Sequence, residues 1–550
     1  MPLELLAVTV STPEPRPSNQ TDSATATAES GTQRPALPSR EDVSTPAELG
    51  LSRAANDRAA QGVRTWSRWV WIQLSLAVFA AVSRLSSLGK PTDGGTPVFD
   101  EKHYAPQSWQ IAMSQTNPLI GGIEDNPAYG LVVHPPLGKQ LESMGMQLLG
   151  YSPAGWRVSS ALCAIAVILL IAAIARRITK SEVAGMLAGI FALCDGILFV
   201  TGRSAMLDHF QTLFVVSATY FLVRDAQQME GRFRRVFAEE RVRDHTLGPR
   251  MGYRWWRFAA GVALAGALSV KWSGLYYLAF AGLAIVAIDY ARRRRYGVQH
   301  PLRGTLVLDS APSFFALVIV PVIGYIASWR AWFASETGVF RHAVESGRFS
   351  ELNESGLTFL PDVVRNFIYY HSSVLKFHTA LTNSNGHHHS WESKPWSWLV
   401  SSRSLLYYSP PEKDGIVHKV LLVGTPAIWW LCVPVILWGV WCLLIHRDMR
   451  WAVPVIGFAA GFLPWLPTLD RQMYLFYAVN LAPFLVIALA LACCQLLHTA
   501  RAENKRWPVV LVVGYVAVVV WNFLFFLPLY TGMPMTNAEF AARMWLPSWR

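Results

Sequence analysis

The chain has 550 residues and a formal net charge of +12, yet only 15% of its residues are charged, while 52% are hydrophobic and 23 are tryptophan. Soluble domains carry about 25% charged residues, so this composition excludes a disordered chain, a coiled coil and a disulfide scaffold, and it indicates a polytopic membrane protein. The six cysteines all fall within apolar stretches, which gives no sign of a disulfide framework or a thiolate metal site.

Residues 1–64 differ in composition from the rest of the chain. They are rich in Ser, Thr, Ala and Pro and nearly free of aromatic residues, which predicts a disordered tail. They contain no short apolar stretch with a small-residue cleavage site, so they do not read as a signal peptide. We therefore expect a cytoplasmic tail, an uncleaved first span, and a single transmembrane domain over residues 65–550.

Eleven apolar segments are each long enough to cross about 30 Å of hydrocarbon as a helix. They lie near residues 69–88, 154–175, 181–201, 206–223, 256–270, 273–289, 311–329, 418–445, 451–467, 472–497 and 507–530. The fold class predicted from this pattern is an all-α integral membrane protein with about eleven transmembrane helices.

Basic residues are concentrated in alternate connections. Nine arginines lie between Arg224 and Arg257, whereas the segment 89–153 holds only three lysines. The positive-inside rule then predicts a cytoplasmic N-terminus and places two large loops, 89–153 and 330–417, on the outer face. The positive charge thus indicates which connections lie in the cytoplasm, and contact with anionic lipids is a further expectation. It does not indicate binding to nucleic acid.

The first outer loop contains a carboxylate pair, Asp100-Glu101, followed by the motif HPPLGK at residues 134–139. Paired prolines fix an extended turn that would present His134 and Lys139 from a stiff backbone. Two plainer interpretations remain: the acidic pair is a solvated loop face, and the prolines mark a helix start.

Further ionisable residues fall at the outer ends of spans. A single basic residue at a span's end is usually a snorkelling anchor, but several on a charge-poor face indicate a site. An anionic lipid-linked substrate fits, because Arg and Lys hold a phosphate and one carboxylate then suffices as a base. These residues are Arg157, Arg203, Asp208, His209, Lys271, Asp470 and Arg471.

Several motifs, in chain order, resemble the bacterial, actinobacterial-type members of the protein O-mannosyltransferase family. They are FDEKHYAPQSW, HPPLGK, RSAMLDHFQTLF, KWSGLYY and HHHSWESKPWSWLVSSRSLLYY. The resemblance covers about residues 69–540. It implies a GT-C membrane glycosyltransferase of the cell membrane, with a polyprenyl-phosphate-mannose donor and with Ser or Thr hydroxyls of exported proteins as acceptors. Transfer would invert the configuration of the sugar.

The resemblance also implies roles for individual residues. Asp100 becomes the base that deprotonates the acceptor hydroxyl, and Glu101 orients acceptor or donor. Arg157 is assigned to the donor phosphate. Lys139, Arg203 and Arg471 are added to the phosphate-binding residues because they are positively charged and lie on the same face of the membrane. His134 is expected to contact the acceptor or the sugar. The second loop lacks room for the β-trefoil MIR domain of the eukaryotic branch, so acceptors must be selected in another way.

The second outer loop contains three consecutive histidines, His387 to His389, and a tryptophan run. Consecutive histidines cannot all face one ion in regular structure, so we predict no metal site, with weak binding aided by Glu392 as the alternative. A divalent metal cofactor is therefore not indicated. Trp391 and Trp396 are assigned to acceptor or sugar contacts, with an interfacial belt as the alternative.

Two other functions remain open at this stage. One is a GT-C enzyme that acts on a lipid or polysaccharide acceptor, and the other is a transporter of an anionic lipid. A transporter would more often show repeats and midplane charges, and the sequence shows neither. Coupling to the protein-export channel is a further expectation, because acceptors would have to arrive unfolded.

Overall fold

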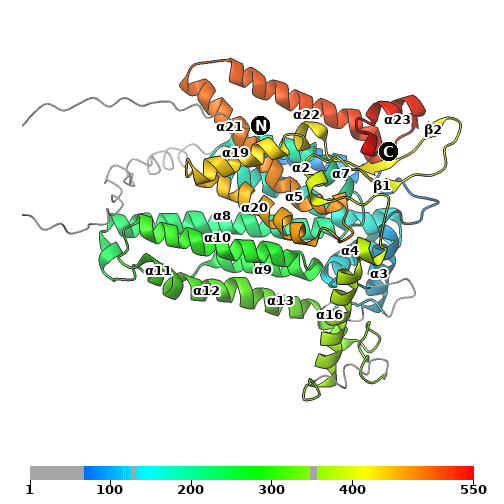
Figure 1. Ribbon diagram of the computed structural model, residues 1–550, viewed down its shortest axis with the longest axis horizontal. Coiled ribbons are helices and arrows are strands. Elements are labelled where there is room, and N and C mark those ends of the chain that lie inside the picture. The colour runs from blue at the N-terminus through cyan, green and yellow to red at the C-terminus, as the bar shows by residue number, and fades with distance from the viewer. Residues whose placement is uncertain (1–66, 116, 118, 126–131, 347–355, 550) are drawn as a thin grey trace, which may run out of the picture.

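The computed structural model describes residues 67–115, 117, 119–125, 132–346 and 356–549. The expected tail, residues 1–64, lies outside this part. The described chain is mostly helical (Figure 1). The helices that form the bundle are α2 (Arg68–Leu85), α5 (Pro153–Thr179), α8 (Asp208–Ala238), α9 (Trp255–Val270), α10 (Gly274–Arg295), α19 (Cys432–Leu444), α20 (Ala452–Phe462), α21 (Ala482–Ala502) and α22 (Trp507–Thr531).

Further helices complete the bundle and its loops. They are α3 (Glu101–Ser114), α4 (Leu137–Leu149), α6 (Glu182–Leu193), α7 (Gly196–Thr201), α14 (Arg330–Ala334), α16 (Asp362–Ala380), α17 (Pro395–Trp398), α18 (Pro426–Trp429) and α23 (Asn537–Arg543). One continuous helical stretch over residues 301–328 alternates α-helix with π-helix, as α11 (Pro301–Gly304), η3 (Thr305–Ser310), α12 (Ala311–Phe314), η4 (Phe315–Ile319) and α13 (Val320–Ser328).

Helices occupy all eleven segments predicted to span the membrane. In the described chain, seven helical stretches are long and apolar enough to cross a membrane by themselves, and these begin at Pro153, Gly274, Pro301, Pro426, Met449, Ala482 and Trp507. The other four segments correspond to α2, the pair α6 and α7, α8 and α9, of which α6 and α9 are simply short. The protein is an all-α, multi-pass membrane protein, as predicted.

Local sequence explains where these helices begin and end. In α5, the Ser152 side chain accepts a hydrogen bond from Gly155 N and Pro153 occupies the first turn, a favoured start. Arg176 and Arg177 complement the helix dipole in the last turn, and Lys180 closes the helix in the left-handed conformation.

One expectation about local structure was wrong. The span predicted over 418–445 starts as a strand, β3 (Val420–Leu422), and becomes helical only at Pro426, because β3 pairs antiparallel with β1 (Leu405–Tyr408). For the HPPLGK motif the plainer interpretation is confirmed: it is a helix start, with Pro136 as the N-cap of α4. A second small sheet pairs β2 (Ile416–Val417) with β4 (Met535–Thr536) near the C-terminus.

The two ends of the bundle differ. At the right of Figure 1, α3, α4, α16 and the strands β1 and β2 gather; we call this the loop end. Isolated bridges join Asp125 to Gly338 and Thr382 to Arg471, so the two long loops are tied to each other and to the turn before α21. At the opposite end lie the arginine-rich connections that follow α8 and α10, and we call this the arginine end.

Candidate active site

Asp100 is the N-cap residue of α3, at the loop end. It follows Phe99, which has a positive φ of 51° and stacks on Tyr407 at 4.3 Å between ring centroids. A non-glycine residue in the left-handed region is held by its surroundings and is common at functional sites. The Asp100 carboxylate is half-buried and makes no hydrogen bond or ion pair within the described chain. It is therefore free to accept a proton from a ligand.

Burial and the nearby charges together shift the pKa of Asp100. Burial raises the pKa of Asp100 to about 6, and the negative charge of Asp208 contributes to the rise, while Lys271, His103 and His389 oppose it. A carboxylate with a pKa near 6 is ionised at neutral pH and is a stronger base than an exposed aspartate.

Glu101 and Arg157 form a buried pair. Arg157 donates to both Glu101 carboxylate oxygens at 2.7 and 2.8 Å, and also to the carbonyl oxygens of Leu88 and Pro91. The same carboxylate accepts from the backbone N–H groups of Val98 and Ala205. Four hydrogen bonds saturate Glu101, and they join the first loop to α5 and to the segment before α8.

A second buried ion pair lies beside Asp100. Lys271 Nζ, at the C-terminal end of α9, lies 2.8 Å from each carboxylate oxygen of Asp208, the first residue of α8. Lys271 also lies over the ring of Phe476, 5.4 Å from its centroid. This pair puts one further cation and one further carboxylate next to the free Asp100.

A row of rings continues from Asp100 toward the second loop. His134 lies 6.1 Å from Tyr104 and stacks on His378 at 5.8 Å, both between ring centroids. Burial lowers the pKa of His134 well below its usual range, and Lys271 and other nearby cations lower it further, so this imidazole is neutral at pH 7. Arg471 donates to the His378 carbonyl oxygen at 2.5 Å, while Arg471 Nε has no hydrogen-bond partner within the described chain.

The other predicted phosphate ligands bond to the protein itself. Lys139 is buried in the first turn of α4, where it pairs with Glu124 and lies 3.3 Å from Gln107. Arg203 donates to the carbonyl oxygens of Ser83, Arg84 and Ser87 at the end of α2. Their predicted role at the donor phosphate stays a prediction, as does that of Arg157.

The second loop contributes exposed and half-buried aromatic residues. Trp396 is 56% exposed, Trp391 is half-buried against the main core, and Trp398 is fully buried. The three histidines are exposed, and His389 lies 5.6 Å from Tyr474. Within the described residues, no group of three His, Cys, Asp or Glu side chains is arranged to hold a metal ion.

The sequence placed Asp208 and Lys271 among the charges of the outer face but indicated no individual role for them, and it did not indicate His378 or Tyr104 as site residues. The signal for the first two was their common position at span ends. Their pairing across 63 residues had no signal in the sequence. His378 lies in α16 within the second loop, and its contact with His134 and Arg471 depends on how that loop folds back.

The arrangement suits transfer of a group to a hydroxyl: a free carboxylate poised as a base, with cations beside it for a departing anion. Among solved structures, the chain matches the Saccharomyces cerevisiae protein O-mannosyltransferase Pmt1-Pmt2 complex bound to the sugar donor. The TM-score is 0.68 at 14% identity, over 90% of this chain and 94% of that one. This is the fold of the GT-C class of membrane glycosyltransferases.

Relatives and family models identify the family within that class. A polyprenol-phosphate-mannose–protein mannosyltransferase of Corynebacterium glutamicum is 49% identical over 486 residues, 86% of this chain and 92% of the relative. The protein of the same name from Mycobacterium tuberculosis is 44% identical over 489 residues, 87% of this chain and 92% of the relative.

Two family models match as well. One, described as dolichyl-phosphate-mannose-protein mannosyltransferase, covers residues 133–235, and the other, the C-terminal four TMM region of protein-O-mannosyltransferase, covers residues 363–549. The chain belongs to the protein O-mannosyltransferase family and is a glycosyltransferase.

Proposed function

We propose that this protein transfers mannose from polyprenyl-phosphate-mannose to Ser and Thr hydroxyls of exported proteins, with inversion at the sugar. The observation that carries the proposal is the 49% identity, over nearly the whole chain, to a relative with that donor and a protein acceptor in its name. The free, half-buried carboxylate of Asp100 supplies the base that the reaction requires.

In this mechanism Asp100 takes the proton from the acceptor hydroxyl. The hydroxyl oxygen then forms a bond to the anomeric carbon, and the bond from that carbon to the phosphate oxygen breaks. Polyprenyl phosphate leaves as an anion, so cations assist its departure and no general acid is needed. Attack on the face opposite the phosphate turns a β-linked donor into an α-linked product.

Two cations are best placed to meet the donor phosphate. Lys271 lies near Asp100 and would exchange its bonds to Asp208 for bonds to phosphate, and Arg471 retains an Nε group without a hydrogen-bond partner in the described chain. Arg157, Lys139 and Arg203 would have to exchange bonds to Glu101, Glu124 and backbone carbonyls in order to bind phosphate. For Arg157 we propose that the pair with Glu101 also holds the Asp100 segment in place.

The loop end faces the outside of the cell membrane, and the N-terminus lies in the cytoplasm. The arginine-rich connections at the opposite end support this orientation through the positive-inside rule. An active site outside the cell has no access to cytosolic nucleotide sugars, which agrees with a lipid-linked donor. Acceptors supplied unfolded by the export channel could then reach the exposed Trp396 and the half-buried Trp391 and His134.

The proposal is tested with purified protein, labelled polyprenyl-phosphate-mannose and a peptide rich in Ser and Thr. Wild-type protein should label the peptide, and Asp100→Asn should reduce the rate by about 10²- to 10⁴-fold, the usual contribution of a general base. Asp93→Asn, an exposed carboxylate in the same loop, is the matched control and should leave the rate unchanged.

Two results would contradict this function. Transfer of label to a lipid or polysaccharide, with none to peptide, would change the acceptor class. Peptide labelling that survives Asp100→Asn at the wild-type rate would remove Asp100 from its role as base.

A further inference from the structure

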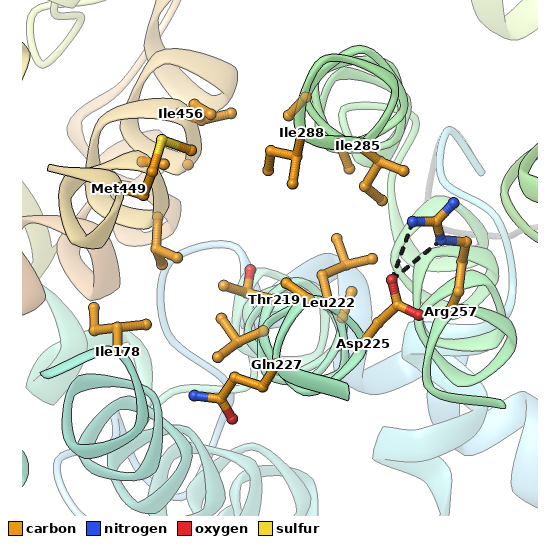
Figure 2. Close-up of a pocket in the computed structure, with 18 of the residues that line it drawn as sticks. Ile178, Thr219, Leu222, Asp225, Gln227, Arg257, Ile285, Ile288, Met449 and Ile456 are labelled. Atoms are coloured by element: carbon orange, nitrogen blue, oxygen red, sulfur yellow. Dashed lines mark hydrogen bonds and ion pairs between the residues drawn. The ribbon is translucent and has the colours of Figure 1, made fainter. Parts of the chain in front are cut away.

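A large cavity lies within the bundle, along the parts of α8 and α10 that lead away from the active site toward the arginine end. Its volume is about 600 Å³, and its walls come from α8 and α10, from α20, and from the end of α5 (Figure 2). On α10 the lining extends from Tyr277 to Arg295, about 27 Å at 1.5 Å per residue. The cavity is thus nearly as long as the hydrocarbon layer is thick, about 30 Å.

Most of this cavity is apolar. In Figure 2, Leu222 of α8 and Ile285 and Ile288 of α10 project into the space, with Met449 and Ile456 opposite them. Phe484 of α21 also lines the cavity, where it stacks on Tyr277 of α10. Water gains few hydrogen bonds along such walls, whereas a hydrocarbon chain is stabilised by every methylene that it buries.

The arginine end of the cavity is basic. Eight Arg or Lys side chains line the cavity, against three acidic ones, Asp225, Glu230 and Asp289. Asp225 and Asp289 are already committed to a buried network with Arg254 and Arg257, at distances of 2.8 to 3.0 Å. These two carboxylates therefore do not neutralise the other basic side chains at the arginine end of the cavity, which we call its mouth.

Two of those cations have no carboxylate partner in the described chain. Arg177 donates only to Tyr220 and to Gln227, both neutral, at 3.2 Å, and Lys180 has no ion pair there. Both lie at the end of α5. Arg295 and Arg450 also line the cavity: Arg295 has a long contact with Glu230, at 3.7 Å, whereas Arg450 is closely paired with Asp448, at 2.7 Å.

We propose that this cavity binds one anionic phospholipid from the leaflet at the arginine end. Its phosphate lies against Arg177 and Lys180, with Arg295 and Arg450 beside it, and an acyl chain runs between α8, α10 and α20. The basic residues at the arginine end and the apolar walls together fit an amphiphile with an anionic head group. A free anion would contact only the basic residues, and an uncharged chain would contact only the apolar walls. The site is separate from Asp100 and does not depend on the transferase reaction.

The test uses purified full-length protein in detergent, with native mass spectrometry and the thermal unfolding midpoint as readouts. Dioleoyl-phosphatidylglycerol should bind one per chain and raise the midpoint by mass action, and dioleoyl-phosphatidylcholine at equal concentration should not. In the double variant Arg177→Gln/Lys180→Gln the affinity for phosphatidylglycerol should fall about tenfold or more. The matched control is Arg303→Gln/Arg506→Gln, two exposed arginines outside the cavity, and it should retain wild-type affinity.

A comparison on the wild-type protein keeps the test independent of variant folding. Dihexanoyl-phosphatidylglycerol and inorganic phosphate should bind at least about tenfold more weakly than the dioleoyl lipid, because they bury fewer methylenes. Three results would each overturn the proposal: phosphatidylcholine binding as tightly as phosphatidylglycerol, inorganic phosphate binding as tightly as the dioleoyl lipid, or an unchanged affinity for phosphatidylglycerol in the Arg177→Gln/Lys180→Gln variant. So would displacement of phosphatidylglycerol by polyprenyl-phosphate-mannose, since the cavity would then hold the chain of the donor.

Discussion

At the residue scale, the Asp100 carboxylate is half-buried beside two ion-pairing groups, yet it keeps its own oxygens free. Its neighbour Glu101 is the opposite case, with four hydrogen bonds from Arg157 and two backbone N–H groups. One member of the acidic pair is available for chemistry and the other holds the loop. Two predictions follow from the charges around Asp100.

The first prediction concerns pH. A base acts in its ionised form, so transfer should lose activity as the pH falls through the pKa of Asp100, about 6. An aspartate with an ordinary pKa would keep its activity about two pH units lower. A profile of kcat/KM between pH 4 and 8 measures the pH at which activity falls on the acid side, which we call the acid limb. An acid limb near pH 4 would show that Asp100 titrates as an exposed aspartate.

The second prediction concerns Lys271. Its positive charge lowers the pKa of Asp100, so Lys271→Met should move the acid limb to higher pH, because the carboxylate then holds its proton more tightly. The KM for the donor should rise as well if Lys271 meets the phosphate. Lys102→Met, an exposed lysine of the same loop, is the control. A limb that stays in place in Lys271→Met would argue that the two groups do not interact.

At the element scale, close helix contacts hold the pieces of the site. Helix α4, which carries Lys139 and follows His134, approaches α5 so closely at Gly145 that an added Cβ would lie 2.5 Å from the Gly155 carbonyl oxygen and 2.6 Å from Val158. The first loop is also bonded to α5 through Arg157. Helix α5 is therefore the support on which the first loop is built.

The third prediction tests this contact with one substitution at two glycines. Gly145→Ala should destabilise the protein by about 1–3 kcal/mol, as overpacking does, and should also reduce transfer by displacing α4. Gly231 lies within α8 with open space around its Cβ position, so Gly231→Ala should stabilise by about 0.5–1 kcal/mol. Thermal unfolding and transfer assays measure both variants. Equal effects of the two substitutions would contradict a tight contact between α4 and α5.

At the scale of the whole molecule, α8 and the α9–α10 segment are joined at both ends. Asp208 and Lys271 pair at the loop end, while Asp225 and Asp289 bind Arg254 and Arg257 at the arginine end. Buried pairs of this kind add little net stability, but losing one partner leaves an uncompensated charge.

The fourth prediction separates stability from catalysis. Asp225→Ala should destabilise the protein by about 3–5 kcal/mol, because Arg254 and Arg257 lose a shared partner. The KM for the donor should not change, since the network lies at the end away from Asp100. Glu239→Gln breaks an exposed pair with Arg241 and should cost less than about 1 kcal/mol. A raised KM in Asp225→Ala would show that the two ends are coupled.

The sequence by itself determined the membrane-spanning helices and the region that contains the base. Apolar length and the distribution of arginine are local properties, so helices were found at all eleven predicted segments, while the role of Asp100 as the base, implied by the family resemblance, stays a prediction. Local pattern failed at residues 418–445, where pairing of β3 with a distant strand delays the helix.

Only the tertiary structure decided which charges have partners. Arg157 meets Glu101 across 56 residues, and Lys271 meets Asp208 across 63. A charged group removed from water binds whichever opposite charge the fold brings within reach, and no local pattern encodes that choice. The same reason explains why the basic mouth of the cavity, with Arg177 and Lys180 lacking carboxylate partners in the described chain, became visible only once the helices were packed together.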